Sequence, residues 1–138
     1  MFSTSLLLLL AAASYVHGIE LTQPTSMTVQ PGQSLSIKCK VSYSVTSDHT
    51  AWIRQPAGKP LEWIGNIYTS GGTAYIDKLK NKFSISRDTA TNTITIGGQN
   101  LQTEDTAVYY CARLGYTAVT HNWAFDYWGK GTAVTVTS

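Results

Sequence analysis

Two cysteines, Cys39 and Cys111, constrain the fold of this chain more than any other feature. Each lies in a segment in which apolar and polar residues alternate, as they do in a β-strand with one buried face. The residues that share the face of a cysteine are Leu35, Ile37 and Val41 in the first segment and Ala107 and Tyr109 in the second. Both sulfurs are therefore expected to point into one core from two different sheets.

The start of the chain indicates that these cysteines are exported. Residues 1–18 contain no Lys, Arg, Asp or Glu, and residues 6–13 form an unbroken apolar run. This run is far shorter than the roughly 20 residues that a membrane-spanning helix needs. Although a basic start is missing, the small residue Gly18 fits a cleavage site. We predict a signal peptide over residues 1–18 and a mature domain over residues 19–138, secreted or at the cell surface.

Export favours a disulfide between Cys39 and Cys111 over two reactive thiols or a metal pair. In the chain-entropy description, closing so long a loop stabilises the fold by about 4 kcal/mol. A mature chain of about 120 residues can also bury roughly two thirds of its unfolded surface, enough for one core. We therefore expect one domain that needs neither a metal nor another cofactor.

The rest of the mature chain is predicted to form β-structure. No segment keeps helical periodicity beyond a turn or two, and turn signals such as Pro31-Gly32 and Gly71-Gly72 interrupt the alternating runs. This spacing predicts an all-β sandwich of two antiparallel sheets with about nine strands. Gly98 takes an inward position where a large apolar side chain is usual, so Gly97-Gly98 is predicted to mark a bulge.

The spacing of Cys39, Trp52 and Cys111 resembles the disulfide and core tryptophan of an immunoglobulin V-type domain. Tyr109, two residues before Cys111, resembles the tyrosine corner, which implies a hydrogen bond from its hydroxyl to the backbone near Asp105. The run over residues 105–113 is similar to the end of a rearranged heavy-chain variable segment. The resemblance covers the whole mature chain.

The residues near the C-terminus resemble a heavy-chain joining segment. Trp128 opens the run Trp-Gly-Lys-Gly-Thr, in which light chains and most T-cell receptor chains have Phe at the first position. The chain is therefore identified as a member of the V-type immunoglobulin family, of the heavy-chain kind. Pro60, Lys130 and the ending over residues 134–138 resemble heavy chains of bony fish.

This resemblance implies an antigen-binding site on three loops at one end of the sandwich, over residues 43–49, 67–73 and 112–127. The third loop is the longest and mixes aromatic and amide side chains with small ones. Aromatic rings supply contact area with few rotors to freeze, and polar groups supply adaptable hydrogen bonds. The residues predicted to bind antigen are Tyr43, Ser47, Asp48, His49, Tyr68, Thr69, Ser70, Leu114, Tyr116, Thr117, His121, Asn122 and Trp123.

A second surface follows from alternation. If Trp52 and Arg54 face the core, Ile53 and Gln55 face outward from the same sheet. An apolar face of this size is not expected to stay in contact with water. The resemblance implies that a light-chain variable domain covers it, through Ile53, Gln55, Leu61, Trp63, Tyr110, Phe125 and Trp128.

Two charge pairs carry over from the family: Lys82 with Asp105, and Arg113 with Asp126 at the base of the third loop. If exposed, each is worth about 0 to 1 kcal/mol. Arg113 and Asp126 are expected to fix the base of the loop, and the alternative for them is two solvated charges. The role of Trp123 also has two readings. It either contacts antigen or folds back toward the light-chain side.

Other functions find little support. The formal charge of +2, without a Lys/Arg cluster, does not indicate nucleic acid or a membrane surface as a partner. The candidate catalytic groups are His49 beside Asp48, and His121. No motif places a nucleophile or a third orienting group near them, so we predict that the chain is not an enzyme. Two histidines alone also make a poor metal site. The remaining alternative is a germline-encoded V-type immune receptor or a T-cell receptor variable domain.

Overall fold

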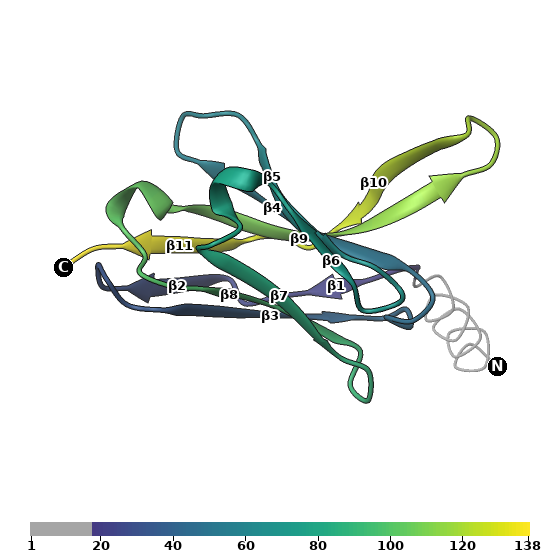
Figure 1. Ribbon diagram of the computed structural model, residues 1–138, viewed down its shortest axis with the longest axis horizontal. Helices are drawn as coiled ribbons and strands as arrows, with labels where there is room; N and C mark the ends of the chain where they lie inside the picture. The colour runs from purple at the N-terminus through teal and green to yellow at the C-terminus, as the bar shows by residue number, and fades with distance from the viewer. Residues whose placement is uncertain (1–17) are drawn as a thin grey trace, which may run out of the picture.

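The computed structural model describes residues 18–138 and shows two β-sheets packed face to face (Figure 1). The four-stranded sheet has the order β1 (Leu21–Thr22), β3 (Leu35–Val41), β8 (Thr93–Gly98) and β7 (Phe83–Asp88). The larger sheet has the order β2 (Ser26–Val29), β11 (Thr132–Val136), β9 (Ala107–Thr117), β4 (His49–Pro56), β5 (Glu62–Ile67) and β6 (Thr73–Tyr75). A seventh strand, β10 (Asn122–Trp128), pairs with β9.

Two short 3-10 helices, η1 (Asp77–Leu79) and η2 (Thr103–Asp105), complete the described elements. No helix within residues 18–138 is long and apolar enough to cross a membrane. The predicted signal peptide over residues 1–18 lies outside the described residues except for Gly18.

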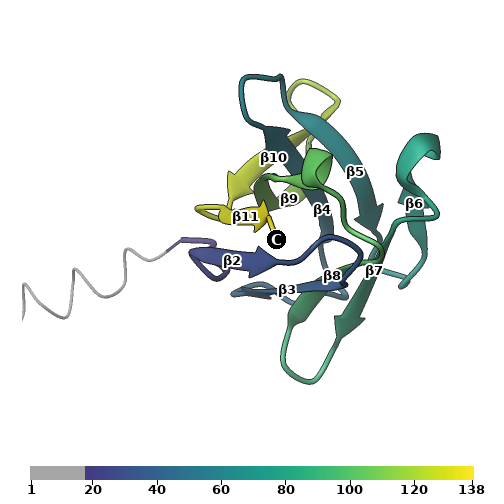
Figure 2. The same cartoon turned by 90° about the vertical axis from the view of Figure 1, so that its left-hand side faces the viewer.

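The predicted V-type sandwich is confirmed, with one difference in its pairing. The first strand of the domain is divided between the sheets, because β1 pairs antiparallel with β3. β2 instead pairs parallel with β11, beside which it lies in Figure 2. Pro24 lies at the switch, and because proline has no N–H it cannot continue a strand ladder. The side chain of Gln23 holds the switch, since its Nε2 donates to the Tyr109 carbonyl over 2.7 Å and its Oε1 accepts from the Cys111 N–H.

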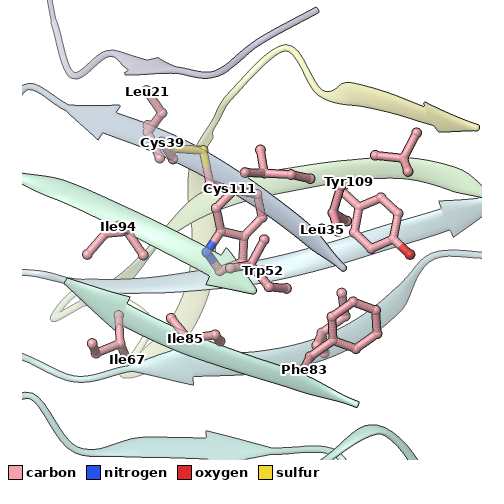
Figure 3. Close-up of a cluster of buried hydrophobic side chains, with 14 of the residues drawn as sticks. Leu21, Leu35, Cys39, Trp52, Ile67, Phe83, Ile85, Ile94, Tyr109 and Cys111 are labelled. Carbon is pink, nitrogen blue, oxygen red and sulfur yellow. A yellow bond between two sulfur atoms is a disulfide. The ribbon is translucent and has the colours of Figure 1, made fainter. Parts of the chain in front are cut away.

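The core lies between the sheets and is centred on the disulfide (Figure 3). The Cys39–Cys111 bond joins β3 to β9 and is confirmed. Trp52 on β4 is fully buried beside it, and Ile37, Ile94 and Ile96 fill the facing sheet. The residues that alternation predicted to point inward therefore form the core.

The bulge predicted at Gly97-Gly98 is wrong. Gly98 pairs in unbroken register with Leu35 on one side and with Phe83 on the other. A Cβ on Gly98 would lie 2.9 Å from a Phe83 ring carbon and 3.0 Å from a Leu101 methyl. Neighbouring side chains thus fill the space that a large residue would occupy.

A charged cluster is buried at the end of the sandwich near η2. The Tyr109 hydroxyl donates to the Asp105 carbonyl over 2.7 Å, as the tyrosine-corner resemblance implied. Lys82 Nζ lies 2.6 Å from Asp105 Oδ2, which confirms that pair, but Asp105 is only 2% exposed. Arg54 donates to Asp105 Oδ1 over 2.9 Å and to Glu62 over 2.7 Å. The pair is therefore part of a buried network rather than two surface charges.

The network sets the ionisation of its members. Burial by itself would raise the pKa of Asp105, but hydrogen bonds from Lys82, the Gln102 N–H and Arg54 outweigh burial and hold it below its usual value. Burial likewise opposes ionisation of Glu62, yet Lys78 and Arg54 lower its pKa. Burial raises the pKa of Tyr109 to about 12. All three groups thus keep one protonation state near neutral pH.

Candidate functional site

Three connections meet at the end of the sandwich away from the C-terminus (Figure 1). The first loop, residues 42–48, joins β3 to β4, and the second loop, residues 68–72, joins β5 to β6. The third connection is the hairpin formed by β9 and β10, which projects beyond the sheets. Sequence segments far apart along the chain are therefore brought to one surface.

The predicted third loop is largely regular structure. β9 and β10 pair antiparallel, with Trp123 opposite Tyr116 and Asn122 opposite Thr117, so only residues 118–121 form the turn. Cross-strand aromatic pairs such as Tyr116 and Trp123 stabilise antiparallel ribbons. The tip is fully accessible, because Val119 is 90% exposed. The hairpin therefore presents its side chains on an ordered two-stranded ribbon.

The base of the hairpin is fixed by the predicted Arg113–Asp126 pair, which is confirmed. The guanidinium donates through Nε over 3.1 Å and through Nη2 over 2.6 Å to the two carboxylate oxygens. Gly115 makes this approach possible, since a Cβ there would lie 2.5 Å from Asp126 Oδ2. Arg113 also lies over the Tyr127 ring, with 5.1 Å between guanidinium carbon and ring centroid.

A row of four rings crosses the site from the hairpin to the second loop. Ring centroids are 5.1 Å apart for Tyr116 and Trp123, 5.3 Å for Trp123 and His49, and 5.1 Å for His49 and Tyr68. Trp123 thus packs toward His49. Of the two readings of Trp123, this geometry agrees with the one in which the ring remains at the loop surface, where it is 56% exposed.

Hydrogen bonds tie the first and second loops together. The Thr69 N–H donates to His49 Nδ1 over 3.0 Å. Arg87 on β7 donates to the Thr69 carbonyl over 2.7 Å and to the Val45 carbonyl over 3.2 Å. Sequence reasoning missed Arg87, although alternation after Phe83 and Ile85 places it on the inward face of its strand.

A groove opens beside the row of rings. It has a volume of about 280 Å³ and is lined by His49, Asn66, Tyr68, Leu114 and Trp123. Asn66 on β5 is buried, and its Oδ1 accepts a hydrogen bond from Trp63 Nε1 over 2.8 Å. Sequence reasoning missed Asn66, because it lies inside a mostly apolar strand and no motif distinguishes it.

The residues predicted to bind antigen fall into three classes of exposure. Ser47, Ser70, Tyr116, Thr117, His121, Asn122 and Trp123 are exposed, and Asp48, His49, Tyr68, Thr69 and Leu114 are half-buried. Tyr43 needs a correction, because it lies in the core, shares a hydrogen bond with the Thr50 hydroxyl, and has its pKa raised by burial to about 12. The inward alternation of β3 continues past Val41 through Tyr43 and Val45, which the sequence prediction did not extend.

The second predicted surface lies on the face of the larger sheet that points away from the core. Gln55, Leu61 and Trp128 are exposed, and Trp63, Tyr110 and Phe125 are half-buried. Leu61 is 52% exposed although it is apolar. Trp128 packs against the rings of Tyr110 and Phe125, with centroids 5.8 and 5.9 Å away. The structure brings these residues together on one surface.

Ile53 needs a second correction. It was predicted to contact a partner directly, but it is 2% exposed and forms a small cluster with Ala51 and Ala112. Trp63 and Phe125 of the same chain pack over this cluster. Ile53 thus faces outward from the sheet, as alternation predicted, yet it supports the surface from beneath.

His49 and His121 lie among the connections of the candidate site and make contacts there. Within residues 18–138 no group of three or more His, Cys, Asp and Glu side chains is placed to hold a metal ion. His49 Nδ1 is engaged by the Thr69 N–H, and His121 Nδ1 lies 3.2 Å from the Tyr116 hydroxyl. Both histidines therefore act as parts of the loop structure.

Comparison with known proteins gives a consistent result. The immunoglobulin V-set domain family matches residues 22–137. The Ig heavy chain V region XIG14 of Xenopus laevis is 47% identical over 112 residues, which cover 80% of this chain and 80% of that protein. The Ig heavy chain V region MOPC 315 of Mus musculus is 43% identical over 135 residues, which cover 96% of each chain. The Ig heavy chain V region MOPC 141 of Mus musculus is 42% identical over 124 residues, which cover 87% of this chain and 86% of that protein. The resemblance to bony fish stays a prediction.

Proposed function

Because the chain belongs to the immunoglobulin V-set family as a heavy-chain variable domain, we propose that it binds antigen through the β9–β10 hairpin and the first and second loops. The observation that carries this proposal is the row of rings from Tyr116 through Trp123 and His49 to Tyr68. It joins the hairpin to the second loop through His49, the first residue of β4, which directly follows the first loop. The V-set family is in general made of binding domains rather than enzymes.

The accessible groups in this row suit recognition. Half of the Tyr116 side chain and more than half of Trp123 are exposed, so both rings have area left to bury against a partner. Rings of this kind dominate interface energetics. Because the Arg113–Asp126 pair and the β-ladder already order the hairpin, little conformational entropy is lost on binding. Tyr43 contributes by supporting the first loop from the core.

We further propose that a light-chain variable domain covers the outer face of the larger sheet. Leu61 and Trp128 are apolar and exposed, and Trp63, Tyr110 and Phe125 adjoin them. Contiguous apolar surface of this kind marks interfaces in soluble proteins. The Gln55 amide donates to the Lys59 carbonyl over 3.3 Å in the free chain and is exposed enough to bond across the interface.

The relatives named above are heavy-chain variable regions, so a germline-encoded immune receptor or a T-cell receptor variable domain is not favoured. Export through the predicted signal peptide, residues 1–18, fits the extracellular or secreted setting of this family, and we retain that segment as part of the proposal.

Antigen binding is tested with the domain paired with its native light chain. A panel of antigens is screened first, and an alanine scan over residues 114–123 is then measured against the antigen found. Truncating a true anchor typically costs 2 kcal/mol or more, about thirtyfold in affinity. We expect such a loss for Tyr116→Ala or Trp123→Ala. Uniform losses below about 0.5 kcal/mol with intact pairing would place the binding energy elsewhere.

Light-chain pairing is tested with Leu61→Arg. An arginine at this position puts a charge into the centre of the apolar surface and is expected to weaken association at least tenfold, because an unpaired charge is costly to bury. Val119→Arg serves as the matched control, since it adds the same charge at the exposed hairpin tip. Sedimentation that shows equal association for both variants would refute the assigned interface.

A further inference from the structure

The groove beside the row of rings has the dimensions of a site for one ring. Its volume of about 280 Å³ is just below the roughly 300 to 1,000 Å³ of small-molecule pockets. Tyr68 and Trp123 are two of its walls, and Leu114 is a third. No Lys, Arg, Asp or Glu is among its five lining residues. The groove is therefore suited to a flat, uncharged group of limited size.

Asn66 supplies a hydrogen-bond donor to this groove. Only 8% of the residue is exposed, yet it lines the groove. The indole N–H of Trp63 can only donate, so the Asn66 oxygen must be the atom that accepts over 2.8 Å. This fixes the orientation of the amide. No hydrogen bond found among residues 18–138 engages Nδ2 of Asn66, and this atom keeps some solvent exposure, so the amino group is available to bond a ligand.

His49 supplies a second donor. Its Nδ1 accepts the hydrogen bond from the Thr69 N–H over 3.0 Å. The neutral imidazole therefore carries its proton on Nε2, because one ring nitrogen accepts while the other donates. The residues that line the groove thus carry two N–H donors, Asn66 Nδ2 and His49 Nε2, beside its aromatic walls.

We propose, on the basis of the antigen-binding function proposed above, that this groove receives the phenol side chain of a tyrosine on a protein antigen. The ring would lie between Trp123 and Tyr68, and its oxygen would accept from Asn66 Nδ2. Stacked and edge-on aromatic pairs are favourable at such spacings. An anion is disfavoured because no fixed positive charge lines the groove to offset its desolvation. A sugar is disfavoured because its many hydroxyls need more partners than two donors.

The test uses N-acetyl-L-tyrosinamide as the probe and the isotopically labelled domain paired with its light chain. In NMR titrations we expect saturable shifts of the Asn66 side-chain amide and the Trp123 indole, with roughly millimolar affinity. N-acetyl-L-phenylalaninamide, which lacks the phenol oxygen, should bind about fivefold more weakly, the typical worth of one neutral hydrogen bond. Methyl glycosides should give no saturable shifts.

Two variants locate the binding site. Asn66→Ala should remove the difference between the tyrosine and phenylalanine probes, whereas Trp123→Ala should weaken both probes at least fivefold. Because Asn66→Ala also frees the Trp63 N–H, intact folding is checked from the spectrum, and Trp123→Ala on the exposed hairpin provides the independent measurement. Ser36→Ala, at an exposed position of β3 in the four-stranded sheet, should leave both probes unaffected.

The proposal is overturned if the two probes bind equally to the native domain, if a methyl glycoside binds more tightly, or if neither variant changes binding. An antigen whose binding survives both Asn66→Ala and Trp123→Ala, but not changes elsewhere in the three connections, would also overturn it. That result would leave the antigen-binding function itself standing. The absence of any antigen would count against that function and would be read separately from the probe titration.

Discussion

Asp105 and Asp126 offer a direct test of how burial decides the value of an ion pair. Each carboxylate lies 2.6 Å from its cationic partner, Lys82 or Arg113. The side chain of Asp105 is 3% exposed, whereas that of Asp126 is 35% exposed. The distances are therefore equal while the exposed fractions differ about tenfold, so comparing Asp105→Ala with Asp126→Ala tests how strongly burial raises the energy of such a pair.

We expect very different losses of stability. Removing one partner of a buried pair costs about 3 to 5 kcal/mol, because the remaining charge is left without compensation. Arg54 keeps Glu62 and the Tyr109 hydroxyl as partners, so Asp105→Ala should cost about 3 kcal/mol, the lower end. Asp126→Ala breaks an exposed pair and should cost at most about 1 kcal/mol.

The assay is urea and thermal unfolding followed by tryptophan fluorescence. For a domain of this size, each kcal/mol shifts the melting temperature by about 4 °C, so Asp105→Ala should lower it by about 12 °C. Asp126→Ala should lower it by no more than about 4 °C. Losses of equal size in the two variants would refute the argument that burial sets the energy of these pairs.

The same residue predicts a pH dependence. The pKa of Asp105 is lowered in the folded state relative to about 3.9 in an unfolded chain. The ionised form therefore stabilises the fold fully above about pH 5, and this contribution is lost as the pH falls through the folded pKa. Asp105→Asn should reduce the dependence of the unfolding free energy on pH in this acidic window. Part of that dependence should remain, because the pKa of Glu62 is lowered as well. An unchanged dependence of the unfolding free energy on pH would contradict the lowered pKa of Asp105.

Three further predictions follow from other parts of the fold. Cys39→Ala should cost about 2 to 5 kcal/mol in urea unfolding, and titration of the native protein with a thiol reagent should find no free sulfhydryl. Gly98→Ala should destabilise the domain by about 1 to 3 kcal/mol, because the new Cβ meets buried Phe83 and Leu101; a gain in melting temperature would show that the space is open. N-terminal sequencing of secreted protein should begin at Ile19, and retention of residues 1–18 on an exported product would contradict the signal-peptide prediction.

Much of the fold could be read from local pattern because inward alternation is a short-range property. The faces of β3 and β9 follow from apolar residues at every second position, and these faces place Cys39 and Cys111 on the same core. The same rule placed Arg54 inward. The sequence indicated the direction of the Arg54 side chain but not its ion-pair partners, because only tertiary packing brings Glu62 and Asp105 next to Arg54.

The site shows where local pattern is insufficient. Residue type identified Tyr116, His49 and Trp123 as binding candidates, but not the ring contacts that join them. Tyr43 was assigned to a loop surface because the family resemblance begins the first loop there, whereas the structure continues the strand alternation and buries it. Asn66 carries no sequence signal, since its role depends on Trp63 Nε1 and on groove walls contributed by other elements.

The sequence by itself determined the all-β class, the disulfide, the tyrosine corner and the family, because each depends on residue identity at fixed spacing along the chain. Only the tertiary structure decided that the third connection is an ordered hairpin, that Ile53 lies beneath its predicted surface, and that Asp105 is buried. These properties depend on which side chains from distant segments exclude water from a given atom. Burial of that kind is a property of the packed assembly of strands, so no local pattern contains it.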